Sequence, residues 1–195
     1  MVFSLAPFFL VPFVVELCLG QVTLGYLPQN FTLSALNTTL PNANHTGAPL
    51  VLGQNGASTG ISFYVTSTYA SYPYNDYPSL GLVNKSLRAY TTSGAWRTNA
   101  TEITSGGTLG WVTTTLYTHA APEIYSAVKL PAYEYSLLAV HGFHDLWSLC
   151  PFPGTYPQTN VVFNASAANP PPPSLGFDPE ECYKVVINIV PIANS

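Results

Sequence analysis

The chain has 195 residues, only 7% of them are charged, and its formal net charge at pH 7 is −4. Its five Lys and Arg residues are too few and too scattered to neutralise a polyphosphate backbone or an anionic membrane surface. The composition therefore excludes nucleic acid as a partner. It also requires that solubility come from Ser, Thr, Asn and, we infer, from attached sugar.

The first twenty residues have the pattern of a secretory signal peptide. Residues 2–15 are almost wholly apolar, and residues 18–20 place small side chains at the two positions that determine cleavage. We expect cleavage before Gln21. The alternative is a membrane anchor, but the apolar run contains prolines, is followed by Glu16 and is shorter than the ~20 residues a spanning helix needs. We therefore expect no membrane association once residues 1–20 are removed.

Residues 21–195 are enough for one domain with a core and too few for two ordinary domains. Apolar or aromatic residues alternate with Ser and Thr between Gly, Pro and Asn, which is the pattern of half-buried strands. The strands predicted in this way are residues 31–35, 49–53, 61–66, 79–83, 111–118, 135–140, 145–149, 160–164 and 183–190. No run of ten residues has helical periodicity, and prolines recur along the chain. The sequence predicts an all-β fold, an antiparallel β-sandwich or barrel.

Turn-forming residues predict the connections. Residues 54–60 and 141–145 are predicted hairpin connections between alternating runs. Residues 71–78 form a predicted excursion rich in tyrosine and proline, which we call the Tyr-Pro loop. Residues 167–174 contain four consecutive prolines and are predicted to be extended polyproline II.

Cysteine usage agrees with export. Cys18 lies in the predicted leader, which leaves Cys150 and Cys182 to pair in an oxidising lumen. Such a bond should stabilise the fold by about 3 to 4 kcal/mol. The alternative is a pair of free thiols that act as nucleophile or metal ligands, although neither cysteine lies in a Cys-x-x-Cys or Cys-His arrangement.

Six triplets of the form Asn-x-Ser/Thr follow the leader. Their asparagines are Asn30, Asn37, Asn44, Asn84, Asn99 and Asn164. Such a triplet is glycosylated only in the secretory lumen, on exposed backbone. Together with the leader they predict a secreted glycoprotein.

Two patterns suggest catalysis or metal binding, each with a simpler explanation. Ser58 lies in a Gly-x-Ser-x-Gly match, and His141 or His144 with Asp145 would complete a catalytic triad on paper. However, residues 61–66 have strand periodicity where the motif needs a helix. The same His and Asp side chains could bind zinc or copper, but their spacing of three suits a helix rather than a turn. We expect no catalytic residue, metal or cofactor here.

Paired carboxylates are the other hydrolytic possibility, because glycoside hydrolysis needs two acids facing each other across a sugar. Glu180 and Glu181 are neighbours in a predicted loop, and the other acids are scattered. The sequence does not decide whether two of them converge.

The Tyr-Pro loop is the candidate ligand-binding segment. Its rings could stack against sugar rings while the phenol hydroxyls form hydrogen bonds. The tyrosines concerned are Tyr72, Tyr74 and Tyr77. Trp96, Trp111 and Trp147 could contribute in the same way. The alternative is that Trp111 and Trp147 are core residues and that the loop packs on itself.

Several segments follow one another as in a known family. They are residues 31–35, 60–65, 137–140, 146–151 and 160–163, and the late Cys182. In this order of elements the chain resembles small secreted fungal cell-wall proteins of the PhiA-like family, in which a Cys-Pro after a strand and a late cysteine recur in a β-rich domain. The chain departs from that family in its Tyr-Pro loop, its proline run and its single cysteine pair. The resemblance implies a glycosylated protein of a fungal wall or extracellular matrix.

The favoured prediction is a secreted, non-enzymatic glycoprotein of a fungal cell wall or surface that contacts wall polysaccharide. The alternative is a secreted hydrolase of extracellular carbohydrate or ester, based on Ser58 or on two carboxylates. A third possibility is an effector or allergen-like module recognised by another organism. The sequence predicts no oligomeric state.

Overall fold

The computed structural model describes residues 21–116, 120–168 and 176–192. The predicted leader and the four consecutive prolines at residues 170–173 lie outside these ranges. Within them, no helix has the length and apolar character that crossing a bilayer would require.

The described chain is built of antiparallel strands and one short 3₁₀ helix. The elements are β1 (Val22–Leu24), β2 (Phe31–Asn37), β3 (Ala48–Ser58), β4 (Ile61–Thr68), β5 (Ser79–Val83), β6 (Ser86–Tyr90), β7 (Trp96–Ala100), β8 (Gly110–Thr114), β9 (Tyr125–Lys129), β10 (Ser136–Val140), β11 (Trp147–Phe152), β12 (Gln158–Phe163), η1 (Pro179–Glu181) and β13 (Tyr183–Pro191). The predicted all-β fold is confirmed.

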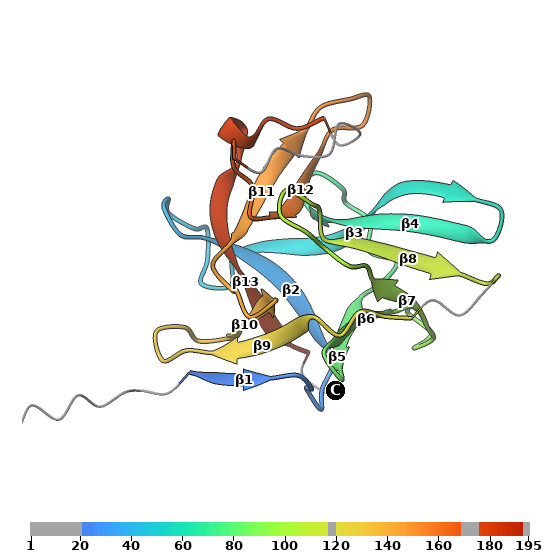
Figure 1. The fold of residues 1–195 in the computed structure, drawn as a ribbon, viewed down its shortest axis with the longest axis horizontal. Coiled ribbons are helices and arrows are strands. Elements are labelled where there is room, and N and C mark those ends of the chain that lie inside the picture. The colour runs from blue at the N-terminus through green and yellow to red at the C-terminus, as the bar shows by residue number, and fades with distance from the viewer. Residues whose placement is uncertain (1–20, 117–119, 169–175, 193–195) are drawn as a thin grey trace, which may run out of the picture.

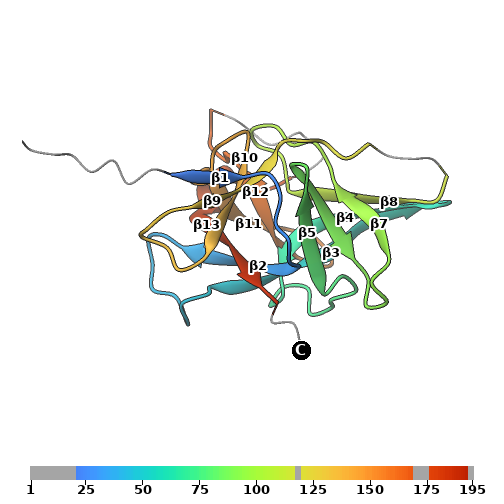
Figure 2. The same cartoon turned by 90° about the horizontal axis from the view of Figure 1, so that it is seen from below.

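Strand pairing closes a barrel. Nine strands follow one another around it in the order β13, β11, β12, β4, β8, β7, β6, β5 and β2, and β2 pairs with β13 again. β3 pairs with both β2 and β4, while β10, β9 and β1 extend the sheet away from β13. Figure 1 and Figure 2 show β3, β4 and β8 projecting together to one side, away from β1, β9 and β10.

Each of the nine predicted strands overlaps an observed strand, although β8 ends at Thr114 and the last two residues of the strand predicted at 111–118 lie outside the described ranges. Four observed strands were not predicted. These are β1, β6, β7 and β9. Residues 125–128 of β9 are all buried, so both of its faces carry small or apolar side chains. β6 follows a two-residue turn, Asn84–Lys85, whose φ angles of 50° and 59° suit a tight hairpin. Short strands buried on both faces, such as β9, therefore escape a test based on period two, whereas the exposed β1 has only three residues in which to show it.

The hairpin predicted at residues 54–60 exists, but most of its predicted loop is strand. β3 continues to Ser58 and β4 begins at Ile61, which leaves a two-residue turn in which Gly60 has φ of 75°. The register shifts between Gln54 and Gly56, so Asn55 forms a β-bulge. Pairing with β4 holds these small polar residues in an extended conformation.

The connection predicted at residues 141–145 turns back at its start, where Val140 and Phe143 form an isolated antiparallel bridge, but the strands on either side of it do not pair as a hairpin. β13 pairs with β10 through Ile189 and Ser136, and with β11 through Val185 and Trp147. Its other edge is occupied by β2 over the same residues. β10 and β11 therefore follow one another along one edge of β13 instead of pairing with each other.

Two tryptophans lie at the centre of the main apolar core, as the simpler interpretation of them predicted. Trp111 and Trp147 are fully buried. The indole N–H of Trp111 donates to Thr66 Oγ1 at 2.8 Å, and that of Trp147 donates to the Leu138 carbonyl at 2.8 Å. Each ring thus buries its apolar area without leaving a donor unpaired.

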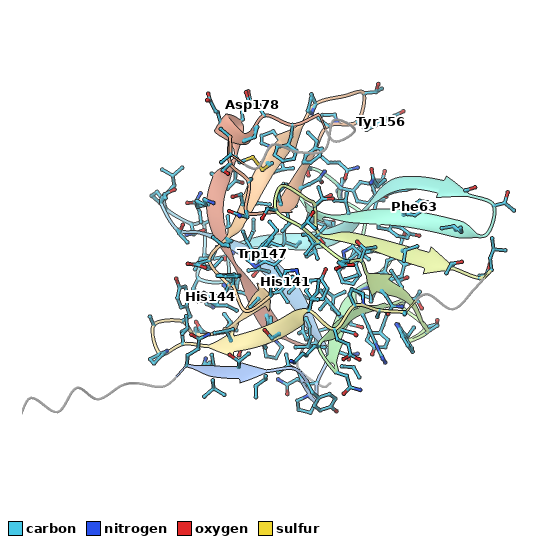
Figure 3. All side chains as sticks on the ribbon, in the orientation of Figure 1. Phe63, His141, His144, Trp147, Tyr156 and Asp178 are labelled. Atoms are coloured by element: carbon cyan, nitrogen blue, oxygen red, sulfur yellow. A yellow bond between two sulfur atoms is a disulfide. The ribbon has the colours of Figure 1, made fainter. Side chains whose placement is uncertain are left out.

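The predicted disulfide forms beside a second, smaller apolar cluster. Cys150 of β11 is bonded to Cys182, which follows η1. Val162, Ala165 and Phe177 complete this cluster, and Phe152 packs against it. The bond ties β11 to the start of β13, and Figure 3 shows it below Asp178.

Replacing both cysteines, Cys150→Ala with Cys182→Ala, should lower the free energy of unfolding by about 3 to 4 kcal/mol, because the bond restricts a long loop in the unfolded chain. Guanidinium unfolding of the oxidised protein measures the difference. Reduced wild-type protein is the matched control and should unfold at the same midpoint as the double variant. Equal midpoints for the oxidised wild type and the double variant would contradict a stabilising role.

Candidate functional site

A groove of about 1000 Å³ opens between two loops that are distant in sequence. One is the first part of the Tyr-Pro loop, after β4, and the other joins β11 to β12. The bulged part of β3 lies between them. The lining residues are 54–56, 70–74, 151–152 and 155–159. We call this the aromatic groove.

The Tyr-Pro loop is anchored by Ser71. The backbone N–H groups of Ser71 and Tyr72 both donate to the Thr68 carbonyl, at 3.0 and 3.1 Å, so the chain turns sharply as β4 ends. The Ser71 hydroxyl donates to the same carbonyl and accepts the backbone N–H of Thr159 at 2.9 Å. This second bond ties the loop to β12. The start of the loop that carries Tyr72 and Tyr74 is therefore fixed against two neighbouring strands.

The opposite wall rests on the disulfide-bonded cluster. The ring of Phe152 packs against that of Phe177, with centroids 4.9 Å apart, and Cys150 lies two residues earlier in β11. Tyr156 lies in the following loop and is 87% exposed. Figure 3 shows it at the outer end of the molecule, far from His141 and His144.

The Gln158 side chain reaches from β12 toward β3 and links the strands on the two sides of the groove. Its side-chain oxygen accepts the Ser67 hydroxyl at 2.8 Å, and its side-chain N–H donates to the Gln54 carbonyl at 3.2 Å. Gly53 makes room for this contact, because a Cβ there would lie 2.5 Å from Gln158 Oε1 and 2.6 Å from Ser67 Oγ. Gln158 is thus held in place by β3 and β4.

The groove offers aromatic faces beside uncharged hydrogen-bonding groups. Tyr72 and Tyr74 meet edge to face at 5.1 Å, and Tyr74 is 63% exposed. Amide and hydroxyl side chains lie among the rings, and no Asp, Glu, His, Cys, Lys or Arg belongs to the lining in the described part of the chain. Such a surface suits a neutral ligand that has both apolar faces and hydroxyl groups.

Tyr77 does not join Tyr72 and Tyr74, contrary to the prediction for the three rings. Only 9% of it is exposed, and its ring packs against Tyr64 at 5.2 Å between centroids. Its hydroxyl donates to the Tyr64 hydroxyl at 3.3 Å and lies 3.2 Å from Thr113 Oγ1. A ring enclosed in this way has no free face for a sugar. Burial raises the pKa of the Tyr64 hydroxyl to about 12, and the hydrogen bond with Tyr77 is the next largest cause of this rise.

The catalytic pattern around Ser58 does not form the turn that its chemistry needs. Ser58 ends β3 and pairs with Ile61, so a strand follows it instead of a helix. It makes no hydrogen bond to any imidazole in the described ranges. His141 Nε2 instead lies 3.1 Å from the Ile103 carbonyl. Within the same residues, no group of three or more His, Cys, Asp or Glu side chains could hold a metal ion.

The six sequon asparagines differ in exposure, and none lines the aromatic groove. Asn30, Asn44 and Asn84 are exposed, whereas Asn37 and Asn164 are half-buried. Asn99 is only 7% exposed, and its side-chain oxygen accepts the indole N–H of Trp96 at 3.0 Å. Asn99 therefore fails the exposure requirement on which its prediction rests.

The Trp96 ring that donates to Asn99 is itself covered by Arg88, whose guanidinium carbon lies 3.8 Å from the ring centroid.

Sequence reasoning missed the wall opposite the Tyr-Pro loop. Residues 151–157, Pro-Phe-Pro-Gly-Thr-Tyr-Pro, combine aromatic rings and prolines as the Tyr-Pro loop does. This shared composition was the available signal. The hydrogen bond between Gln158 and Gln54 had no signal in the sequence, because 104 residues separate the two.

Comparisons with models of protein families, with curated proteins and with solved structures gave no match to this chain. Its function is therefore inferred from the groove and from the residues around it.

Tyr64 should make the stability of the fold sensitive to alkali. Its folded pKa of about 12 lies above the ordinary 10.0, so the unfolded chain loses this proton first. Its contribution to stability is complete below about pH 10 and is lost as the pH rises toward about 12. Denaturant unfolding at about pH 9 and about pH 11 measures this loss, which should be smaller in Tyr64→Phe.

Tyr74→Phe is the matched control, because Tyr74 is exposed. It should lose stability between the two pH values as the wild type does. An equal loss in Tyr64→Phe and wild type would contradict the role given to Tyr64.

Proposed function

We propose that this protein is a secreted, N-glycosylated, non-enzymatic protein of a fungal cell wall or cell surface, and that it binds neutral wall polysaccharide in the aromatic groove. The observation that carries the proposal is the groove itself. It places exposed tyrosine rings beside amide and hydroxyl side chains and has an uncharged lining.

A pyranose ring matches both the aromatic rings and the uncharged polar groups of this lining. Its C–H groups form an apolar face that stacks on an aromatic ring, and its hydroxyls exchange hydrogen bonds with amides and hydroxyls. Tyr74 and Tyr156 supply exposed rings, and Asn55 and Thr155 supply uncharged polar groups. Because the lining is uncharged, a neutral glycan enters without leaving a charge unpaired.

The chemistry of the groove favours binding over hydrolysis. Glycoside hydrolysis uses two carboxylates, and acyl transfer uses a nucleophile with an adjacent base. The described lining has neither a carboxylate nor an imidazole. Ser58, the candidate nucleophile, lies outside the lining in a strand-to-strand hairpin.

Export is supported by features independent of the groove. The Cys150–Cys182 bond is of the kind that persists in oxidising compartments. At least three of the six sequon asparagines are exposed, as glycosylation requires. Glycans at these positions would leave the groove open, because none of the asparagines lines it.

Removing the three tyrosine rings of the aromatic groove together should weaken binding. We expect Tyr72→Ala with Tyr74→Ala and Tyr156→Ala to lower affinity for insoluble β-glucan or chitin by about tenfold or more, which corresponds to about 1.4 kcal/mol. Co-sedimentation isotherms with each polysaccharide measure it. Tyr26→Ala is the matched control, because Tyr26 is 56% exposed and lies outside the groove.

Two results would oppose the proposal. One is equal retention of the triple variant and the wild type on every wall fraction. The other is binding of a proline-rich peptide, with no binding of polysaccharide, since aromatic grooves also accept polyproline II segments. Release of soluble sugar by the wild type, abolished in Ser58→Ala, would favour the hydrolase instead.

A further inference from the structure

A second recess, of about 430 Å³, lies on another part of the molecule. Its lining includes Asn42, Asn44 and His45 from the loop between β2 and β3. Residues 132–135, from the loop between β9 and β10, face them, and Asn188 of β13 also contributes. We call this the loop recess. It differs from the aromatic groove in that a sequon asparagine is part of its lining.

The sequon at Asn44 is folded into a turn that leaves its nitrogen free. Asn44 Oδ1 accepts the Thr46 hydroxyl at 2.8 Å, the Thr46 backbone N–H at 3.1 Å and the Gly47 N–H at 2.8 Å. These bonds span two or three residues, so the turn can form before the chain folds. Asn44 is exposed, and its Nδ2 makes no hydrogen bond within the described ranges.

Buried groups hold this turn at the edge of the recess. The Thr46 carbonyl accepts the Ser34 hydroxyl at 2.6 Å and the Asn188 side-chain N–H at 2.9 Å. Gly47 has φ of 93°, and a Cβ there would lie 2.2 Å from the Ala35 carbonyl oxygen. Residue 47 must therefore be glycine. Asn44 is fixed relative to β2 and β13 and cannot swing freely with its loop.

The two loops meet through exposed contacts. The rings of His45 and Tyr135 are stacked with centroids 6.3 Å apart, and Tyr135 Oη lies 3.4 Å from His45 Nε2. His45 Nε2 is also 3.8 Å from Glu134 Oε2, with both side chains more than 60% exposed. Contacts of this kind in water contribute little to stability. A group seated between the loops would cover them and join the two segments.

We propose that Asn44 carries an N-glycan whose first sugar occupies the loop recess and joins the β2–β3 loop to the β9–β10 loop. The inference rests on the secretion and glycosylation in the proposed function. In this reaction Asn44 Nδ2 loses a proton and bonds to the anomeric carbon of an oligosaccharide. The bond between that carbon and a phosphate oxygen of the lipid pyrophosphate donor breaks. Because the sugar is then tethered to the recess, a weak stacking contact with Tyr133 or Tyr135 suffices to seat it.

Asn37 provides a matched comparison. Its Oδ1 accepts the Thr39 hydroxyl at 3.0 Å, and the backbone N–H groups of Thr39 and Leu40 at 2.8 Å each. The local turn is thus the same as at Asn44, but Asn37 does not line the recess. A sugar on Asn37 should leave the β9–β10 loop unaffected.

The test compares hydrogen exchange in glycoforms of the secreted protein. An endoglycosidase that cuts within the core leaves one sugar on each occupied asparagine, and glycopeptide mass spectrometry locates these sugars. We expect a sugar on Asn44, and exchange at residues 130–135 at least about threefold slower than in Thr46→Ala, which lacks this sequon. Thr39→Ala, which loses the Asn37 sequon, should match the wild type. Thr46→Ser keeps the sequon and should restore the slow exchange.

Each alternative result has a distinct meaning. A bare Asn44 beside sugars on Asn30 or Asn84 would overturn the inference while leaving the proposed function intact. A sugar on Asn44 with equal exchange in wild type and Thr46→Ala would overturn its place in the recess. The absence of sugar from all six sequons would instead contradict the glycosylated, secreted protein of the proposed function.

Discussion

The pairing of β13 with β2 closes the barrel, and the rest of the structure depends on it. Seven residue pairs join the two strands, from Val185 with Asn37 to Pro191 with Phe31. The other edge of β13 holds β11 and then β10, so one C-terminal strand organises three others. Ile187 and Ile189 bury their side chains in the main core between these partners. Because β2 and β13 lie at opposite ends of the chain, this contact forms only after a large loss of chain entropy, as is typical of slow-folding β proteins.

The aromatic groove follows from this closure. β11 pairs with β13 on one side and with β12 on the other, so the wall that contains Phe152 is held in place by the C-terminal strand. The Cys150–Cys182 bond reinforces the same connection. The facing wall is the start of the Tyr-Pro loop, after β4, and it is tied to β12 through the hydroxyl of Ser71. Loops fixed by strands on both sides lose little freedom when a ligand binds, which favours affinity for weakly interacting sugars.

We propose two separate roles for sugar in this protein, as a ligand of the aromatic groove and as a covalent modification. The aromatic groove has an uncharged lining and no sequon asparagine, so a polysaccharide could bind without meeting the protein's own glycans. Asn44, in contrast, lies in the loop recess beside the exposed His45–Glu134 contact. With charged residues at only 7% of the chain, attached sugars would also supply much of the hydrated surface that charges usually provide.

Local patterns along the chain determined that the fold is all-β, where its longer strands lie and that Cys150 and Cys182 pair, but they left open whether Trp111 and Trp147 are core residues. Alternation and turn chemistry depend on neighbouring residues, so they are legible in the sequence itself. Only the tertiary structure decided that β10 and β11 share one edge of β13, that Tyr77 and Asn99 are buried, and that Gln158 reaches Gln54. These outcomes depend on which strands pair across long separations, and the pairing is set by packing among all the strands at once.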